Sequence, residues 1–399
     1  MPKLYLAIDN CFATKRWTRP LEWARKVREL GLTYVEASAD TENDPLYHGA
    51  AYQERWLEEV EAACRTTGVR VANLYSGHGT YSTLGLGHTD ADVARRLLEE
   101  WLKPQVRAAA RLGAGLGFFA HAFSISTLAD PEAYKAARDD LVSRLAELAR
   151  YAQSRLSAPI GVEQMYAPHQ IPWTLQGTRE LLSDIHTAAG APMYTNVDVG
   201  HQSGQSRFPR PTFESFEKSV ALLRDESEEQ LPWLGVEEAY TLAEAVAAGG
   251  ERIETAWERV DAMAAERPYL FAKPEDGDPY RWLSAFGPYS PIVHLQQTDG
   301  ESSPHAPFTP PWNAKGIITG ERVLTALAKG YEEPFMPESV PPVEELYLTI
   351  EVFLSTASNP FSSFRELRRT VEYWRRFVPE DGMELREAVD RLGKEMIHG

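Results

Sequence analysis

Four short stretches in the second half of the chain share one pattern, in which apolar or small residues run into a single side chain that can bind a metal ion. A β-rich run that ends in a polar residue and precedes a loop and a helical pattern is typical of a buried parallel strand with a functional group at its carboxyl end. The pattern therefore predicts a barrel with a mononuclear metal site at its mouth. The stretches are residues 159–163, 194–198, 291–294 and 348–351, which end at Glu163, Asp198, His294 and Glu351.

Eight strand candidates occur along the chain, and most are separated by patterns with apolar residues at three-to-four spacing, as in amphipathic helices. Strand and helix alternation is typical of an α/β fold, and eight is the strand number of a TIM barrel. We therefore predict a single α/β domain over residues 1–399, a (β/α)8 TIM barrel. The candidates are residues 4–9, 33–37, 69–75, 116–121, 159–163, 194–198, 291–296 and 347–352.

The connection between the sixth and seventh strands, residues 199–290, is far longer than a usual helical crossover. It predicts a long insertion at the carboxyl rim of the barrel, where such segments most often form lids or subunit contacts. Within this part of the chain we expect helices over residues 210–224 and 242–263. Residues 268–291 are expected to form a loop.

The end of the chain adds a segment beyond the barrel. Residues 364–377 are expected to form the eighth barrel helix, and residues 378–399 a C-terminal extension with an extra amphipathic helix. The insertion and the extension both offer apolar surface for a second subunit, so we expect a homo-oligomer, either a dimer or a tetramer.

Composition narrows the classes of partner. The formal net charge is −17, and no cluster of Lys and Arg stands out, so we expect no nucleic-acid partner. No apolar run reaches the length of a membrane span, and the N-terminal residues do not resemble a signal peptide, so we expect no membrane partner and a cytoplasmic location. The two cysteines, Cys11 and Cys64, are too few for a disulfide framework.

The four strand-end residues form a hard, oxygen-rich ligand set. Taken singly, a Glu or Asp at a strand end is more often a helix cap or an ion-pair partner than a metal ligand, and the alternative for the histidine is a core residue. Together at converging strand ends, Glu163, Asp198 and Glu351 would repel one another, and a divalent cation relieves that repulsion. With His294 the set suits Mn²⁺ best, with Mg²⁺, Co²⁺ or Zn²⁺ as alternatives, and argues against a thiolate-bound structural zinc.

At these residues the chain resembles the xylose-isomerase-like TIM-barrel superfamily, in particular its sugar (phosphate) isomerase and epimerase branch, which includes the ketose 3-epimerases. In that branch a Glu ends strand five, an Asp with a His three residues later ends strand six, a His ends strand seven and a Glu ends strand eight. The matching residues here are Glu163, Asp198, His201, His294 and Glu351. The resemblance spans residues 1–375 and rests on the order and strand placement of these residues.

The resemblance implies a metal-dependent sugar isomerase or epimerase that acts on an open-chain ketose or aldose by proton transfer through an enediolate. In the resembled family the counterparts of Glu163 and Glu351 are metal ligands and also the catalytic acid and base. His201 would hydrogen-bond the substrate oxygen beside the metal, and its alternative role is to orient Asp198.

Two positions depart from the ketose 3-epimerase pattern. Those enzymes carry a second Glu where this chain has His169, and an Arg near the place where it reads Thr298-Asp299-Gly300. Both positions normally touch substrate hydroxyls, so ketohexose 3-epimerase activity is in question. Asp299 has two open roles, in binding a hydroxyl or in capping the next element. The substrate-binding candidates, for which rim packing is the alternative, are His201, His169, Asp299, His78, His121 and Trp312.

Three other functions remain open. Lyases of the same superfamily that dehydrate inososes begin with the same proton abstraction. The endonuclease IV-like nucleases use three zinc ions and further histidines, which the acidic charge and the histidine pattern disfavour. A non-catalytic barrel would use its acidic rim only to bind a partner or a structural cation. The last idea predicts that Glu351→Gln leaves function intact, whereas the isomerase idea predicts a loss of turnover with the fold retained.

Overall fold

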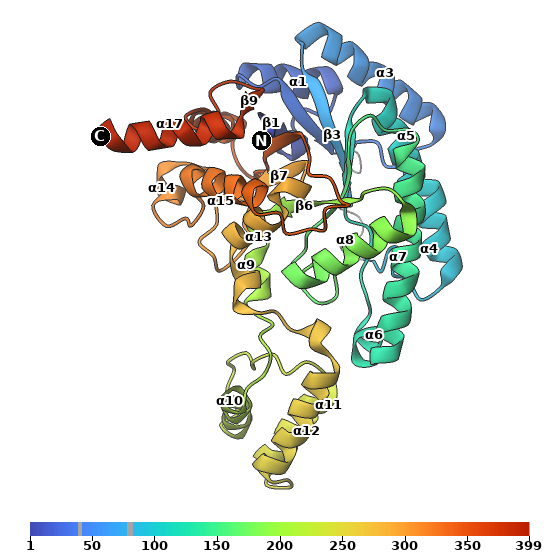
Figure 1. Ribbon diagram of the computed structural model, residues 1–399, viewed down its shortest axis with the longest axis vertical. Helices are drawn as coiled ribbons and strands as arrows, with labels where there is room; N and C mark the ends of the chain where they lie inside the picture. Colours follow the sequence, from blue (N-terminus) through green and yellow to red (C-terminus); the bar gives the residue numbers. More distant parts are fainter. Residues whose placement is uncertain (39–41, 78–82, 399) are drawn as a thin grey trace.

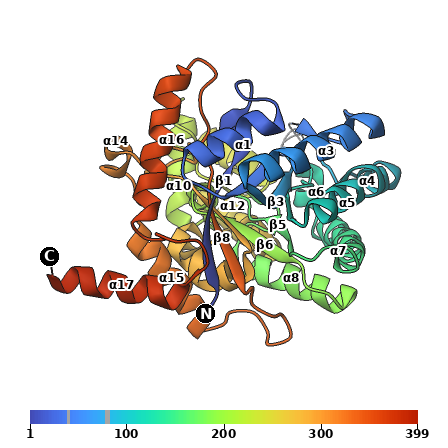
Figure 2. The same cartoon turned by 90° about the horizontal axis from the view of Figure 1, so that it is seen from above.

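A closed barrel of eight parallel strands forms the centre of the molecule (Figure 2). The computed structural model describes residues 1–38, 42–77 and 83–398. Each strand pairs with the next along the chain, and β8 pairs with β1, which closes the ring. The predicted α/β TIM barrel is confirmed. Its strands are β1 Lys3–Asp9, β2 Tyr34–Ser38, β3 Arg70–Ser76, β4 Gly115–Phe118, β5 Ile160–Glu163, β6 Tyr194–Asp198, β7 Ile292–Leu295 and β8 Glu345–Ile350.

Helices surround the strands, and the longer ones bury an apolar stripe against the barrel. The longest is α7, which begins at an Asp130 side chain that accepts from Glu132 N and buries Leu141, Leu145 and Leu148. The other barrel helices are α1 Pro20–Glu29, α3 Ala50–Thr67, α4 Ala91–Leu97, α5 Lys103–Leu112, α6 Ile125–Ala129, α8 Leu175–Ala189, α14 Pro310–Asn313, α15 Gly320–Glu332 and α16 Pro360–Arg375, with a π turn at Leu98–Leu102 and a 3-10 turn at Asn10–Ala13.

The alternation of side chains along each strand separates an apolar outer face from a polar inner one. On β8, Leu346, Leu348 and Ile350 are buried beneath the helices. The residues between them face the barrel axis, where Tyr347 stacks on Tyr5 of β1 at a centroid distance of 4.9 Å. The carboxyl ends of the same strands carry the charged residues described below.

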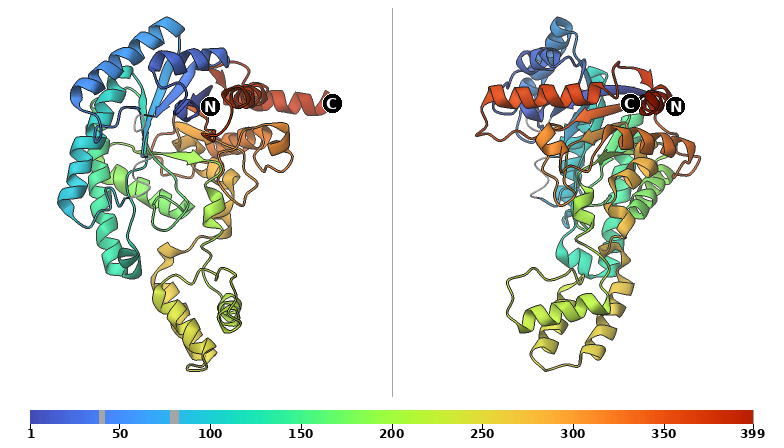
Figure 3. Two further views of the ribbon diagram at one scale, coloured as in Figure 1. Left: turned by 180° about the vertical axis from the view of Figure 1, so that it is seen from behind. Right: turned by 90° about the vertical axis from the view of Figure 1, so that its left-hand side faces the viewer.

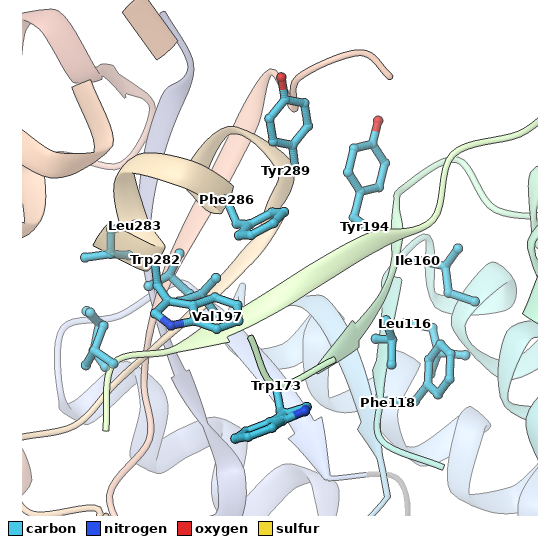
Figure 4. Close-up of a cluster of buried hydrophobic side chains, with 14 of the residues drawn as sticks. Leu116, Phe118, Ile160, Trp173, Tyr194, Val197, Trp282, Leu283, Phe286 and Tyr289 are labelled. Atoms are coloured by element: carbon cyan, nitrogen blue, oxygen red, sulfur yellow. The ribbon is translucent and has the colours of Figure 1, made fainter. Parts of the chain in front are cut away.

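One wall of the barrel is packed against a helix where the sequence predicted a loop. Residues 268–291 contain α13, Pro279–Phe286, together with short 3-10 turns at Pro268–Leu270, Pro274–Gly277 and Gly287–Tyr289. Figure 4 shows Trp282 and Phe286 of α13 beside Val197 of β6. The loop prediction was wrong, because the Asp278 side chain caps this helix by accepting from Tyr280 N and Pro279 occupies its first turn.

The insertion carries a helical arm, residues 207–272, that projects away from the barrel (Figures 1 and 3). Its helices pack on one another and bury Phe216, Leu242 and Val260, which belong to the same apolar cluster as the barrel core. The single helix predicted over residues 242–263 was wrong, because Gly249 adopts a φ of 76° and breaks it in two. The insertion helices are α9 Gln202–Gln205, α10 Phe213–Arg224, α11 Glu237–Ala247 and α12 Ile253–Glu266.

The C-terminal extension is helical, as predicted. Helix α17, Leu385–His398, leaves the barrel beside α15 (Figure 1). A short strand that the sequence did not predict, β9 at Met383–Glu384, precedes it and pairs antiparallel with β1. Among the helices that the structure describes, none is long and apolar enough to cross a membrane.

Candidate metal centre

The four predicted ligand residues lie together at the carboxyl ends of neighbouring strands. Glu163 and Asp198 are the last residues of β5 and β6, His294 is the third residue of β7, and Glu351 follows β8. One ligand atom from each lies within 4.8 Å of all the others. Their exposed fractions are only 2%, 0%, 1% and 8%, respectively.

Strand pairing explains why distant parts of the chain meet here. Asp198 is the direct partner of His294 across the β6–β7 ladder. The Glu351 N–H donates to the carbonyl of Leu295 at 3.0 Å, which extends the β7–β8 pairing by one residue. Each ligand is therefore fixed by main-chain hydrogen bonds of the barrel wall, as functional groups of TIM barrels are.

His294 is the centre of the cluster. Its Nδ1 atom lies 3.2 Å from Glu163 Oε1 and 3.4 Å from Glu351 Oε2. On the other side of the ring, Nε2 lies 2.8 Å from Oε2 of Glu36, a fully buried residue of β2. Sequence reasoning missed Glu36, although a charged residue between the apolar Val35 and Ala37 is an unusual signal in a buried strand.

Asp198 is held on several sides. Gln296 Nε2 donates to both of its carboxylate oxygens, at 2.8 and 3.0 Å, and Gly200 N donates at 2.6 Å. His201 Nε2 lies 3.8 Å from Asp198 Oδ2. Because His201 Nδ1 lies 2.6 Å from the carbonyl oxygen of Gln164, that nitrogen carries the proton in the neutral ring and leaves Nε2 with a lone pair.

Two further side chains reach the cluster that the sequence analysis did not single out. Tyr75 of β3 donates its hydroxyl to Glu163 Oε2. His305 lies in the loop after β7, with a backbone φ of 47°, and its Nδ1 is 3.4 Å from Glu351 Oε2. Its ring stacks on Phe353 at a centroid distance of 3.9 Å. No strand end or helical period marks a loop residue of this kind, so its position was not visible in the sequence.

The donor set fits a divalent cation. Two buried atoms of the cluster, Glu351 Oε2 and His305 Nδ1, have no hydrogen-bond partner among the described residues. Buried polar atoms are normally satisfied, and an unpartnered carboxylate oxygen among other carboxylates is the arrangement that a bound ion completes. Glu163, Asp198, His294 and Glu351 would hold the ion. Asp198, His201 and His305 form a second, overlapping group of ligand-type atoms.

Burial and neighbouring charges set the protonation of the cluster. Burial raises the pKa of Glu351, and His294 and His305 offset only part of that effect. Burial acts in the same direction on Asp198, but His201, His305 and His294 outweigh it and lower its pKa to about 2. For Glu163 the hydrogen bond from His294 outweighs burial and lowers the pKa. The two glutamates of one small centre are therefore pushed in opposite directions.

A cavity of about 630 Å³ opens above the cluster. Glu163, His201, Glu351 and His305 form its floor, and its volume suits a small polar ligand. Its wall includes Tyr166, Arg207, Phe208, Glu301 and Phe353.

Other predicted substrate-binding residues do not line this cavity. His121 is fully buried, and its Nε2 pairs with the carbonyl of Ile171, while burial lowers its pKa to about 4. The Nδ1 atom of His169 lies 2.8 Å from the carbonyl of Phe123. Both rings are therefore engaged with the barrel frame rather than turned to the cavity. Of the substrate-binding candidates, His201 alone among the described residues lies on the cavity floor.

Asp299 and Trp312 do not line the cavity either. Asp299 Oδ1 accepts from Glu301 N at 3.1 Å, which is the capping arrangement that was one of its two open readings. Trp312 lies in α14 beneath the Lys315 ammonium, 3.9 Å from the ring centre. His78 lies outside the described residues. A substrate-binding role for any of these stays a prediction.

Comparison with known proteins agrees with this geometry. Residues 24–223, half of the chain, match the family model described as xylose isomerase-like TIM barrel. The chain belongs to this family. Members share the barrel that places the cluster, so the resemblance drawn from the strand-end residues is confirmed at the level of the family.

A stretch of 59 residues is 44% identical to D-erythrulose 1-phosphate 3-epimerase of Brucella abortus. This stretch is 15% of the chain and spans about a fifth of the length of that relative. Among solved structures, a xylose-isomerase-like protein of Rhodospirillum rubrum aligns over 94% of this chain and 99% of its own, with a TM-score of 0.66 and 18% identity. D-psicose 3-epimerase of Clostridium cellulolyticum aligns over 94% and 98%, with a TM-score of 0.52 and 12% identity. At these identities the solved structures support the fold alone.

Proposed function

We propose that the protein is a divalent-metal-dependent sugar isomerase or epimerase that acts on an open-chain ketose or aldose. The observation that carries the proposal is the buried cluster of Glu163, Asp198, His294 and Glu351, of which the two glutamates line the floor of a cavity. A divalent cation held there, with Mn²⁺ as the first choice, would supply Lewis-acid polarisation of the substrate carbonyl. The Brucella relative that matches a short stretch of the chain, D-erythrulose 1-phosphate 3-epimerase, has an activity of the same class.

The two glutamates divide the proton transfer between them. Glu163 accepts a hydrogen bond from Tyr75, which favours its charged form and suits it to remove the proton next to the carbonyl. Glu351, whose pKa burial raises, is suited to hold a proton and return it to the resulting enediolate. Opposite shifts of paired groups are the usual signature of an acid and a base.

The remaining residues bind and orient. His201 turns its Nε2 lone pair toward the cavity floor and would accept a hydrogen bond from a substrate hydroxyl. Phe353 and Tyr166 give the cavity apolar walls that fit the C–H faces of a sugar. Arg207 lies at the cavity wall and donates to the carbonyl of Glu301, so a phosphorylated sugar belongs in the substrate panel.

A second candidate is a lyase that removes a hydroxyl as water, as in inosose dehydration. One observation favours it. Glu351 and Asp198 raise the pKa of His305 to about 9 against the opposing effect of burial, so a protonated imidazole stands beside the glutamate. After the same proton abstraction, such a group can protonate a leaving hydroxyl.

Proton exchange tests the proposal. The full chain, loaded with Mn²⁺, is incubated in D₂O with ketoses, aldoses, their phosphates and inososes, and carbon-bound deuterium is followed by NMR. Deuterium at one carbon, lost with EDTA and in Glu351→Gln, is the expected result, and its position identifies the substrate class. Loss of a hydroxyl in the product would favour the lyase. No exchange with any of these compounds, despite bound metal, would overturn the isomerase proposal in favour of a binding role.

A cytoplasmic location and a homodimer or homotetramer belong to the same proposal. The projecting arm, residues 207–272, and helix α17 are the surfaces that we expect to meet a second copy. Light scattering on the purified full chain measures the mass directly, and a monomer at micromolar concentration would contradict this part.

A further inference from the structure

Glu36 on β2 is a fully buried carboxylate to which the proposed proton transfer gives no role. Its oxygens have different partners. Oε2 lies 2.8 Å from His294 Nε2, and Oε1 accepts a 2.5 Å hydrogen bond from Asn73 Nδ2 of β3. Among the described residues no Lys or Arg forms an ion pair with it. A buried carboxylate is costly unless it is paired, so the His294 ring is the partner that makes its burial tolerable.

This contact decides which nitrogen His294 presents to the other carboxylates. A neutral imidazole carries its proton on one nitrogen and a lone pair on the other. Because Glu36 is an acceptor at Nε2, the proton belongs at Nε2 and the lone pair at Nδ1. Nδ1 is the atom that lies 3.2 Å from Glu163 Oε1 and 3.4 Å from Glu351 Oε2. The ring is thus set, in tautomer and in angle, to offer Nδ1 to a cation in the cluster.

We propose that Glu36 is the positioning residue of the metal centre, which orients His294 as a ligand through Nε2, and that Asn73 holds Glu36 in place. Carboxylates that bind the second nitrogen of a ligating histidine commonly raise its basicity and fix its orientation. The inference rests on the proposed function only in taking His294 as a metal ligand. Metal binding, measured without turnover, is therefore its proper test.

The chain supplies a matched control in Glu42, which lies in the same half of the molecule. Its carboxylate accepts from Trp23 Nε1 at 3.1 Å, from Trp56 Nε1 at 2.9 Å and from Asn10 Nδ2 at 2.9 Å. Within the described part of the chain these partners do not include any of the four ligands, so its removal perturbs a similar carboxylate without touching His294.

The dissociation constant for Mn²⁺ is measured on the full chain from the EPR signal of free Mn²⁺, at one pH, with folding checked by circular dichroism. Glu36→Gln keeps the size of the side chain and removes its charge, and we expect the dissociation constant to rise about 10- to 100-fold. Glu42→Gln is expected to stay within about twofold of the unmodified chain, because it leaves the histidine untouched. Equal constants for Glu36→Gln and the unmodified chain would overturn the proposal.

A double-mutant cycle shows whether Glu36 acts through the histidine. In a His294→Ala background the effect of Glu36→Gln should shrink to less than about threefold, because the residue it positions is gone. A full effect in that background would contradict the mechanism. If Glu36→Gln does not fold, Asn73→Ser removes the donor to Oε1 and should raise the constant about 3- to 10-fold; an unchanged constant there counts against the proposal.

The two proposals fail separately. A chain that binds Mn²⁺ with the expected cycle but exchanges no carbon-bound hydrogen overturns the proposed function and leaves the role of Glu36 standing. Normal hydrogen exchange, together with a Glu36→Gln variant that binds Mn²⁺ as tightly as the unmodified chain, overturns the role of Glu36 and leaves the proposed function standing. A chain that binds no divalent cation at all overturns both.

Discussion

The two halves of the barrel wall bury carboxylates equally well but satisfy them differently. Strands β5 to β8 supply the cluster that faces the cavity, and there Glu351 Oε2 is left without a hydrogen-bond partner. Strands β2 and β3 supply Glu36 and Tyr75, which are engaged with Asn73, His294 and Glu163. We call these the ligand half and the supporting half. An unpartnered buried oxygen costs stability, so its presence in one half marks where a bound group belongs.

Removal of the metal is expected to have the largest effect on the ligand half. We expect EDTA to abolish turnover, because the ligand half then holds only mutually repelling carboxylates. At a Mn²⁺ concentration 100 times the dissociation constant, the ion should add about 2.7 kcal/mol to the free energy of unfolding. Urea unfolding with Mn²⁺ and with EDTA measures the difference, and Ca²⁺ or Na⁺ at equal ionic strength provides the control. Equal stability in all conditions would show that the cluster holds no ion.

The next largest effect is expected for Glu351→Gln, which removes one charge from the ligand half. Turnover should fall at least ~10³-fold, since the residue is both ligand and proton donor in the proposed reaction. Because burial raises the pKa of Glu351, its charged form is disfavoured in the fold, and the metal-free variant should be at least as stable as the metal-free parent at pH 8.

The control for that variant is Glu345→Gln, at the other end of the same strand, where the carboxylate accepts from Tyr5 Oη at 3.0 Å. It should leave turnover within about twofold, since active groups of TIM barrels lie at the carboxyl face. Equal losses of turnover in both variants would mean that Glu351→Gln disturbs strand β8 and not the reaction itself.

The ligand half could be predicted from the sequence, whereas the supporting half could not. The ligand half was predictable because a polar residue at the end of an apolar run follows from the period of a strand, and parallel strands must bring their ends together. Glu36 lies inside its strand, and only its partner across the barrel, 258 residues away, explains its charge. His305 was invisible for a different reason, since a loop residue with a φ of 47° obeys no period.

The errors in the fold have local causes. Residues 268–291 were expected to form a loop, whereas Asp278 and Pro279 begin a helix that buries Trp282, Leu283 and Phe286. Gly249 and the residue after it were overlooked within a helical pattern that they interrupt. Helix and strand periods therefore predicted where the elements lie along the chain. They could not predict which distant residues a single side chain contacts in the fold.

A smaller effect is expected in the supporting half from Tyr75→Phe. The variant removes the hydroxyl that donates to Glu163 Oε2 and keeps the ring, which lies at a centroid distance of 5.6 Å from His294. A hydrogen bond to a charged group contributes about 1.5 kcal/mol, so turnover should fall roughly tenfold. Tyr347→Phe at the lower end of the barrel loses a hydroxyl too, 3.3 Å from Glu345 Oε2, and should have no such effect. A loss beyond ~10³-fold would place Tyr75 among the reacting groups.

No effect on turnover is expected for Glu42→Gln, but the variant should remove a pH dependence from the stability of the parent. Burial raises the pKa of Glu42 to about 7, although Trp56, Trp23 and Asn10 donate to it. Between pH 4.5 and 7 the unfolded chain therefore binds fewer protons than the folded one, so the parent loses stability as the pH rises through this window, by at most about 3 kcal/mol. Glu42→Gln should lack this loss, and the exposed Glu59→Gln should retain it. Urea unfolding at pH 4.5, 5.5, 6.5 and 7.5 measures how the free energy of unfolding changes with pH. If this free energy changes equally in the variant and the parent, burial does not control the Glu42 carboxyl. The distinction between a structural Glu42 and a positioning Glu36 then rests on metal affinity alone.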